Sequence, residues 1–402
     1  MADRQLLQNL LQQHPSFYLY EEAGIRAAAQ RLTAAFSGAQ ILYSVKCNPY
    51  TQVLNTIFSA GFGADAASLG EVEAAERHGV PKEQIYFSAP ARTEADLRAA
   101  WGRCTLIADS LHEIDLIRRI GEEWGEVPEI GVRINPSFTF TSDDGLPGKF
   151  GIDEELLWDA DLSGVKITGI HVHAKSQELS ADVLSGYYEK MFRLVKRVQN
   201  HLEVTLRFAN FGSGLGIPFA PGETELDIET LGQQFQTMLA QARTRFPDLQ
   251  ILIESGRYVV GQNGTYVTRV LDKKESRGKT FLLLHNTLNG FARPAIAQMV
   301  RTFTDTPFPC EPLFTHVDAT AFLPLTDTAE TETVTLAGNL CTAADIIAKD
   351  ISLPRMEIGD GLAMTNAGCY ASVMTPIQFA SLTPPSQLFL TADGQIICAD
   401  AL

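Results

Sequence analysis

The chain has 402 residues, 45% of them hydrophobic and 20% charged, which is enough for a barrel and a second domain. A formal net charge of −16 argues against a nucleic-acid surface, because phosphate binding needs clustered lysine and arginine. The six cysteines form no CxxC pair, so we expect neither a zinc ribbon nor a disulfide framework, and a cytoplasmic protein fits best. The polar N-terminus and the lack of a long apolar run predict no secretion signal and no membrane span.

Eight short β-branched or aromatic segments begin near residue 40, and polar turns and amphipathic helical patterns alternate with them. They are 41–46, 61–67, 84–90, 104–110, 129–135, 167–174, 206–214 and 250–256. Helical patterns between them include 68–79, 93–102, 110–125 and 185–202, and Ser68 with Glu71 is typical of a capping box. Eight such units predict an α/β fold, the (β/α)8 or TIM barrel, with a site at the C-terminal ends of the strands.

The pattern changes after about residue 260 to β-rich segments such as 264–286 and 331–338, with proline-rich loops between them. We therefore expect a barrel over 36–265 and a β-rich domain made of 1–35 and 266–402. The segment SFYLY (16–20) could pair as a strand into that second domain, which would make it discontinuous.

Polar residues stand at the ends of the apolar runs, where barrel chemistry is normally placed. The set is Lys46, Asp65, Arg133, His173, Gly212 and Glu254. A strand-end lysine in a half-buried pocket suits Schiff-base formation, although such a lysine can equally be salt-bridged. The turn from Gly212 to Gly214 can present backbone N–H groups to a phosphate, or can be only a turn. A carboxylate at Glu254 could hold a pyridine nitrogen protonated while Arg257 meets phosphate oxygens, or the two could form an ion pair that closes the barrel.

Two alternating histidines, His171 and His173, share one face of the sixth strand, so one could stack on an aromatic cofactor. A metal site is disfavoured because no nearby motif clearly supplies a third ligand. In the second domain, Cys341, Asp345 and Tyr370 lie in AGNLCTAAD and GDGLAMTNAGCY. Position alone gives Cys341 no role, since most buried cysteines are inert.

These segments together resemble the fold-type III pyridoxal-phosphate decarboxylases, which include diaminopimelate and ornithine decarboxylases and share their barrel with alanine racemase. The resemblance spans nearly the whole chain and rests on YSVKCN, GADAASLGE, RINP, KFGI and HVHAKSQ. FGSGLGIP stands where the family has a triple glycine, ESGR where it has EPGR, and AGCY where it has AGAY. Ser213, Ser255 and Lys175 are departures that an anionic phosphate should tolerate.

The resemblance implies pyridoxal 5'-phosphate as cofactor and the α-decarboxylation of a small amino acid. It implies that Lys46 carries the cofactor, Glu254 faces the ring nitrogen, His173 stacks on the ring and Cys341 protonates the α-carbon. The implied cofactor-binding set is Lys46, Asp65, His173, Ser176, Gly212, Ser213, Gly214, Glu254, Arg257 and Tyr370. Because the family supplies its cysteine from the neighbouring subunit, we expect a homodimer with shared active sites.

Two positions that resemble specificity elements point in different directions. Arg293 matches the diaminopimelate decarboxylase arginine that holds a distal carboxylate, whereas Thr342 replaces the acid that receives a distal amine. CTAAD resembles relatives that act in siderophore or antibiotic assembly, so we expect a substrate with a distal carboxylate or an acylated nitrogen. A meso-diaminopimelate decarboxylase of lysine biosynthesis stays open, with Asp345 or Glu311 as the amine contact.

Three rival functions are weighed against this one. An amino-acid racemase of the same fold is disfavoured by the glutamate at the ring nitrogen. A catalytically silent regulator, like the antizyme inhibitors, is disfavoured by the retention of Lys46, Glu254 and Cys341. A metal-dependent barrel hydrolase is the most distant alternative.

Overall fold

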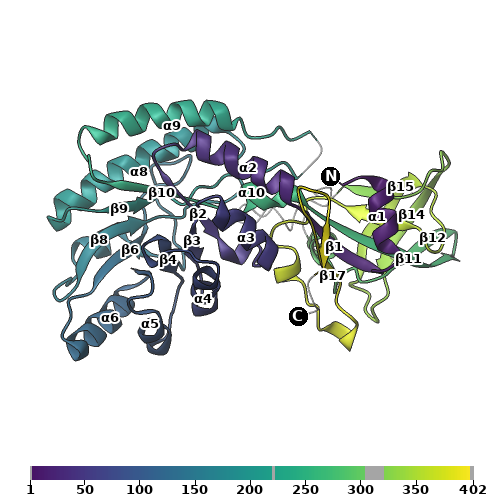
Figure 1. Cartoon of the computed structure of the whole chain (residues 1–402), viewed down its shortest axis with the longest axis horizontal. Coiled ribbons are helices and arrows are strands. Elements are labelled where there is room, and N and C mark those ends of the chain that lie inside the picture. The colour runs from purple at the N-terminus through teal and green to yellow at the C-terminus, as the bar shows by residue number, and fades with distance from the viewer. Residues whose placement is uncertain (1, 220–221, 304–320, 399–402) are drawn as a thin grey trace. The chain divides into compact units, whose positions relative to one another are not determined.

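The computed structural model describes residues 2–219, 222–303 and 321–398 (Figure 1). Contacts within the chain divide it into two compact units. The barrel unit comprises residues 28–216 and 226–256, and the β-rich unit comprises residues 1–27, 217–225 and 257–402. Among the described residues, no helix combines the length and the apolar character that a membrane span needs.

The barrel unit is built around a closed ring of parallel strands. In ring order the strands are β2 (Gln40–Ser44), β3 (Gly63–Ala66), β4 (Ile85–Ser88), β5 (Thr105–Ala108), β6 (Glu129–Asn135), β8 (Lys166–His171), β9 (Phe208–Asn210) and β10 (Gln250–Ser255). Pairing of β10 with β2 closes the ring, and the short β7 (Ile152–Asp153) pairs with β6 outside it. The predicted eight-stranded α/β barrel is therefore confirmed.

Helices follow most of these strands, and five of them have an N-cap side chain that accepts a backbone hydrogen bond. They are α3 (Thr51–Ser59), α4 (Leu69–Arg77), α5 (Glu94–Ala100), α6 (Leu111–Trp124), α7 (Glu154–Trp158), α8 (Ala181–Leu202) and α9 (Ile228–Arg243), together with α2 (Glu22–Ala35), which begins in the β-rich unit. The capping box expected at α4 is only half formed. Ser68 accepts from the Glu71 N–H, but the Glu71 carboxylate accepts from Ala67 N–H, one residue too early for the reciprocal bond.

Apolar side chains fill the interior of the ring. Leu42, Tyr86, Ile107, Phe208 and Leu252 form one buried cluster. The Phe208 ring fits because two facing residues are glycines: a Cβ added at Gly169 or Gly131 would lie 2.2 or 2.8 Å from that ring. Each large buried side chain contributes about 1.5–3 kcal/mol, so the interior is a packed core that supports the polar strand ends.

The β-rich unit is a second sheet, and its strands come from both ends of the chain. The strands are β1 (Ser16–Glu21), β11 (Gly264–Ser276), β12 (Lys279–Leu284), β13 (Phe322–Pro324), β14 (Thr331–Gly338), β15 (Ile346–Pro354), β16 (Gly361–Met364), β17 (Ser386–Leu390) and β18 (Ile396–Cys398). The N-terminal strand β1 pairs antiparallel with β11 and parallel with β17, which confirms the predicted pairing of SFYLY into this sheet.

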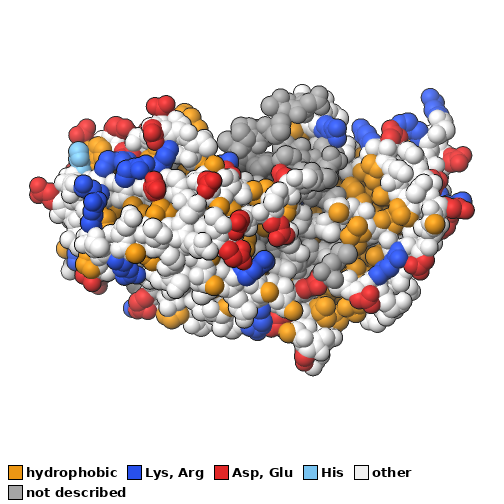
Figure 2. Space-filling model, turned by 90° about the horizontal axis from the view of Figure 1, so that it is seen from above, with side chains coloured by type: hydrophobic (Ala, Val, Ile, Leu, Met, Phe, Trp, Pro, Cys, Tyr) orange, Lys and Arg blue, Asp and Glu red, His pale blue; other side chains and the backbone are white. Residues whose placement is uncertain are grey.

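The described residues of the β-rich unit include the helices α1 (Arg4–Leu11), α10 (Arg257–Val260) and α11 (Arg293–Arg301). Leu7, Leu10 and Leu11 of α1 pack into a core with Phe17 and Val267 of the sheet. On the face drawn in Figure 2, acidic and basic side chains are mixed over much of the surface. That mixture differs from the continuous basic stripe of a nucleic-acid surface.

Candidate functional site

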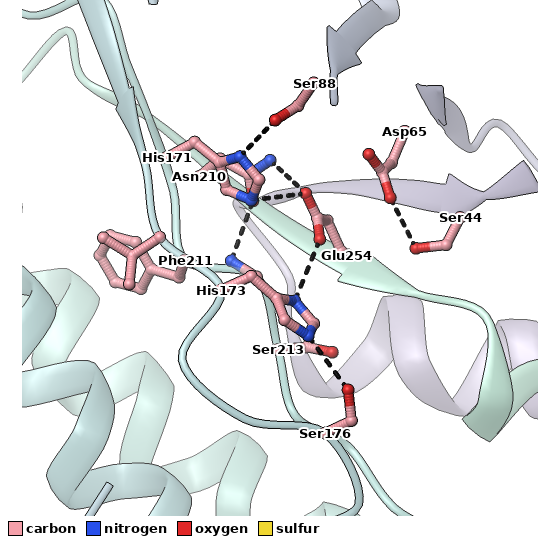
Figure 3. A network of polar contacts seen from close by, with 12 residues as sticks. Ser44, Asp65, Ser88, His171, His173, Ser176, Asn210, Phe211, Ser213 and Glu254 are labelled. Carbon is pink, nitrogen blue, oxygen red and sulfur yellow. Dashed lines mark hydrogen bonds and ion pairs between the residues drawn. The ribbon is translucent and has the colours of Figure 1, made fainter. Parts of the chain in front are cut away.

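The amine of Lys46 lies beside a buried carboxylate at the ends of two neighbouring strands. Strand β2 ends at Ser44, and the following 3₁₀ turn carries Lys46. Its Nζ lies 2.6 Å from Asp65 Oδ2 on β3. Figure 3 shows that Ser44 donates its hydroxyl to the same oxygen, at 2.9 Å. The Asp65 side chain is 3% exposed and that of Lys46 is 42% exposed, so a fixed carboxylate orients an amine that solvent can reach.

A second buried carboxylate, that of Glu254 on β10, lies beside three polar side chains (Figure 3). Asn210 on β9 donates its amide to Oε1 at 2.7 Å, and His171 Nε2 lies 3.1 Å from the same oxygen. His173 Nδ1 lies 3.5 Å from Oε2, so both histidines lie beside this carboxylate, although β8 ends at His171 and His173 belongs to the segment that follows it. Burial by itself would raise the pKa of Glu254, but His171, His173 and the charge of Lys46 hold that pKa well below 4.5. The carboxylate is therefore ionised at neutral pH.

The turn after β9 depends on two glycines with positive φ. Gly212 has φ of 59° and Gly214 has φ of 78°. A Cβ at these positions would lie 2.7 Å from the Val172 carbonyl oxygen and 2.6 Å from the Phe140 ring. Ser213 stands between them and is 8% exposed, so the serine that departs from the family's triple glycine occupies the one position that tolerates a side chain. Ser176 lies nearby, with its Oγ 3.0 Å from His173 Nε2.

In the β-rich unit, Arg257 carries a buried hydrogen-bond donor that is unused. The residue is 7% exposed, and its guanidinium lies 5.7 Å from the centre of the Phe219 ring and 5.3 Å from that of Tyr370. Its Nη1 atom has no hydrogen-bond partner among the described residues. A buried guanidinium N–H without a partner is costly, and an anion such as a phosphate is the group that would satisfy it.

The predicted substrate-binding residues also lie in the β-rich unit. Arg293 is 3% exposed and donates to the carbonyl oxygens of Asn366 at 2.8 Å and Cys369 at 2.5 Å. Thr342 is half-buried and Cys341 is exposed. Glu311 lies outside the described residues.

Asp345 is committed to the internal structure of its own unit. It is 2% exposed, and its carboxylate accepts from the Thr287 hydroxyl and from the N–H groups of Leu288 and Leu340, each at 3.0 Å. Every oxygen of this carboxylate therefore has a donor from the protein.

The structure thus brings Lys46 together with Asp65, and His173 with Ser176 and Glu254, inside the barrel unit. It brings Arg257 together with Tyr370 inside the β-rich unit. Sequence reasoning did not assign a role to Asn210, although its place as the last residue of β9 was a usable signal. In the described part of the chain no group of three or more metal-ligating side chains comes together.

Comparisons with known proteins show the family of the chain. Residues 22–261 match the family model described as the pyridoxal-binding domain of the pyridoxal-dependent decarboxylases. The chain is 30% identical over 387 residues to the L-glutamyl-[BtrI acyl-carrier protein] decarboxylase of Niallia circulans, and the match covers 92% of this chain and 88% of the relative. It is 25% identical over 398 residues to the 2-[(L-alanin-3-ylcarbamoyl)methyl]-2-hydroxybutanedioate decarboxylase of Staphylococcus aureus, with 94% and 95% covered.

The fold is similar to the crystal structure of diaminopimelate decarboxylase from Helicobacter pylori complexed with L-lysine. The TM-score is 0.80 at 26% identity, with 97% of this chain and 95% of that chain covered. The closed barrel and the family match define a pyridoxal-phosphate enzyme of fold type III. The chain belongs to the pyridoxal-dependent decarboxylase family and is a carboxy-lyase that acts on an amino acid.

The side chains present fit pyridoxal 5'-phosphate. Lys46 supplies an oriented amine, Glu254 supplies an ionised carboxylate, and Arg257 supplies an unpaired buried donor for an anion. Positions 212 and 214 of the turn carry no side chain that could shield its backbone, although the Gly212 N–H is itself donated to Asn210.

Proposed function

We propose that this decarboxylase acts on an amino acid whose far end carries a carboxylate or an acylated, uncharged nitrogen. The observation that carries the proposal is the state of the segment after Cys341. Thr342 is neutral, and the Asp345 carboxylate is buried and already accepts three hydrogen bonds from its own unit. A buried ammonium without a carboxylate partner is costly, so this segment disfavours a substrate with a distal amine.

The names of two relatives also describe substrates without a free distal amine. One is named for an L-glutamyl group on an acyl-carrier protein, and the other for an L-alanin-3-ylcarbamoyl group joined to a hydroxybutanedioate. In the second name the distal nitrogen is acylated and the far end carries carboxylates. A racemase is not favoured, because both relatives are decarboxylases.

For the distal carboxylate, Arg293 is the proposed contact. A guanidinium has five N–H donors. The Nη atoms of Arg293 use three of them on the carbonyl oxygens of Asn366, Cys369 and Tyr370, and its Nε is buried without a partner among the described residues. Unused donors therefore remain for an acid group on the substrate.

The proposed catalytic roles are those that the resemblance to the family implies. Bound pyridoxal phosphate supplies an electron sink for the electrons that remain when the α-carboxylate leaves as CO2. Lys46 holds the cofactor, Glu254 keeps the ring nitrogen protonated and His173 packs on the ring face. The Cys341 thiol delivers the proton to the α-carbon. The remaining cofactor contacts are Asp65 beside the lysine and, at the phosphate, Ser176, Gly212, Ser213, Gly214, Arg257 and Tyr370.

A homodimer with shared active sites is part of the proposal, with Cys341 reaching the site of the neighbouring subunit. Mixed subunits test it, because Lys46→Ala and Cys341→Ala each remove a different half of a shared site. Heterodimers of the two inactive variants should recover part of the activity. No recovery after confirmed subunit exchange would refute the shared site. The described cysteines are free thiols, in keeping with the proposed cytoplasmic setting.

Steady-state rates decide the substrate class. The panel comprises meso-diaminopimelate, ornithine, lysine, and L-2,3-diaminopropionate acylated on its side-chain nitrogen by a dicarboxylic acid. The acylated compound should be the best substrate, and Thr342→Glu should move the preference toward the diamines. Turnover of meso-diaminopimelate by the unmodified enzyme at a kcat/KM of about 10⁴ M⁻¹s⁻¹ or more would refute the proposal.

A further inference from the structure

Asn210 makes two directed hydrogen bonds from a fully buried position in the barrel unit. It is 1% exposed, donates through Nδ2 to Glu254 Oε1 at 2.7 Å, and accepts through Oδ1 from the Gly212 N–H at 2.9 Å. Because one partner can only accept and the other can only donate, the orientation of the amide is fixed. One side chain therefore joins the Glu254 carboxylate to the glycine turn.

His171 supports the same carboxylate oxygen from the other side. Its Nε2 lies 3.1 Å from Oε1, and its Nδ1 lies 3.0 Å from the Ser88 hydroxyl. Burial lowers the pKa of His171 although Glu254 acts to raise it, so the ring is neutral at neutral pH. Because Nε2 lies beside a carboxylate, the neutral ring carries its proton there, and Nδ1 can accept from the Ser88 hydroxyl.

The two carboxylate oxygens of Glu254 thus differ. Oε1 accepts a hydrogen bond from Asn210 and lies 3.1 Å from His171 Nε2, whereas Oε2 lies 3.5 Å from His173 Nδ1. Oε1 is the anchored atom, and Oε2 is the atom with capacity left for another donor.

We infer that Asn210, assisted by His171, is a positioning residue that fixes Glu254 and the glycine turn relative to each other. The inference rests on the proposed roles of Glu254 at the ring nitrogen and of Gly212 at the phosphate. A single amide then sets the spacing between the groups that hold the two ends of the cofactor. Pre-organised contacts of this kind reduce the cost of binding and keep a reactive group in place.

The amide must be an amide rather than a carboxylate. An aspartate at 210 could still accept from Gly212 N–H, but it would place a second acceptor 2.7 Å from Glu254 Oε1, where the amide nitrogen now lies. Two carboxylates at this distance repel each other when both are ionised, so one of them would take up a proton. The other ionisable groups that act on Glu254 and His171 are Lys46, Asp65, Arg133, His173 and Tyr187.

The test is Asn210→Asp, which changes one atom, measured in the full chain with and without cofactor. Asn135 provides a matched control, because it also donates an amide N–H to a carboxylate, Asp153, at 2.7 Å, but at an exposed position. Asn210→Asp should lower the denaturation midpoint of the cofactor-free protein at pH 7, and Asn135→Asp should lower it much less. Adding Glu254→Gln to Asn210→Asp should restore the midpoint, because the new amide can donate to the new carboxylate.

With cofactor bound, Asn210→Asp should move the acid limb of kcat upward by about one pH unit or more. The double variant should fold and bind cofactor but stay slow, because it lacks the ionised Glu254. If Asn210→Asp behaves like Asn135→Asp, or if Glu254→Gln does not rescue its stability, the positioning role is wrong. Should Asn210→Asp alone fail to fold, failure of the double variant to fold would also refute the role. Normal turnover by Glu254→Gln alone would instead refute the proposed function of Glu254.

Discussion

Replacing Arg92 with methionine is expected to destabilise the barrel unit by about 3–5 kcal/mol, the usual effect of removing one partner of a buried ion pair. Arg92 and Glu113 have side chains that are 2% and 3% exposed. The guanidinium donates to both carboxylate oxygens at 2.8 Å and to the carbonyl oxygens of Phe87 and Ile107 at 2.7 and 2.5 Å. It therefore joins strands β4 and β5 to helix α6 behind the site.

The size of the effect comes from the charge that is left behind. Methionine fills a similar volume but leaves the buried Glu113 carboxylate without the Arg92 guanidinium. The carboxylate would keep the hydrogen bond from the Asp109 N–H, at 2.7 Å. Removing both charges, as in Arg92→Met with Glu113→Leu, should recover most of the loss. Arg98→Met is the matched control, since Arg98 pairs with Glu94 and Glu123 at the surface, where solvent screens the charges.

Tryptophan fluorescence is the assay, because all three tryptophans, at 101, 124 and 158, belong to the barrel unit. Urea titrations then report this unit separately from the β-rich unit. A loss below about 1 kcal/mol for Arg92→Met, or no recovery in the double variant, would contradict the assigned role of the buried pair.

Three further predictions concern the site. Asp65→Asn should slow the binding of the cofactor to Lys46 about fivefold, because the half-exposed ion pair between the two residues contributes about 1 kcal/mol. Stopped-flow absorbance measures this rate, and an unchanged rate would argue against the ion pair. Cys341→Ala should lower kcat by about 100-fold or more with cofactor affinity unchanged, and loss of cofactor would make the cysteine structural. The free energy of unfolding should fall on acidification, because the pKa values of His171 and Glu254 are lower in the folded protein than in the unfolded chain. The loss should begin below pH 6.5 through His171 and continue below pH 4.5 through Glu254. Urea midpoints across pH test this, and a flat profile from pH 7 to 4 would contradict it.

The barrel could be predicted from the sequence because its strands and helices are recognisable within short segments of the chain. Each strand is a short apolar run, most of them are followed by a helix, and all eight runs form strands of the ring. The strand ends were also informative, although β2 and β8 end at Ser44 and His171, two residues before Lys46 and His173. The extra residues form turns, which local propensity does not distinguish from strand ends.

The contacts of the site could not be predicted, because they join residues far apart in the chain. Asn210 and Glu254 are separated by 44 positions, and Ser88 and His171 by 83. No periodicity links such pairs; only closure of the ring brings them together. Similarly, the partners of Asp345 in its own unit follow from the pairing of β12 with β14 and were invisible in CTAAD.

The most direct test of the central claim is to locate the cofactor on the chain. Borohydride reduction of the enzyme loaded with pyridoxal phosphate should fix the cofactor covalently to its lysine, and peptide mass mapping then identifies the residue. The account predicts the added mass on the peptide that contains Lys46, and its loss together with turnover in Lys46→Ala. Label on another lysine such as Lys175, or normal turnover by Lys46→Ala, would contradict it.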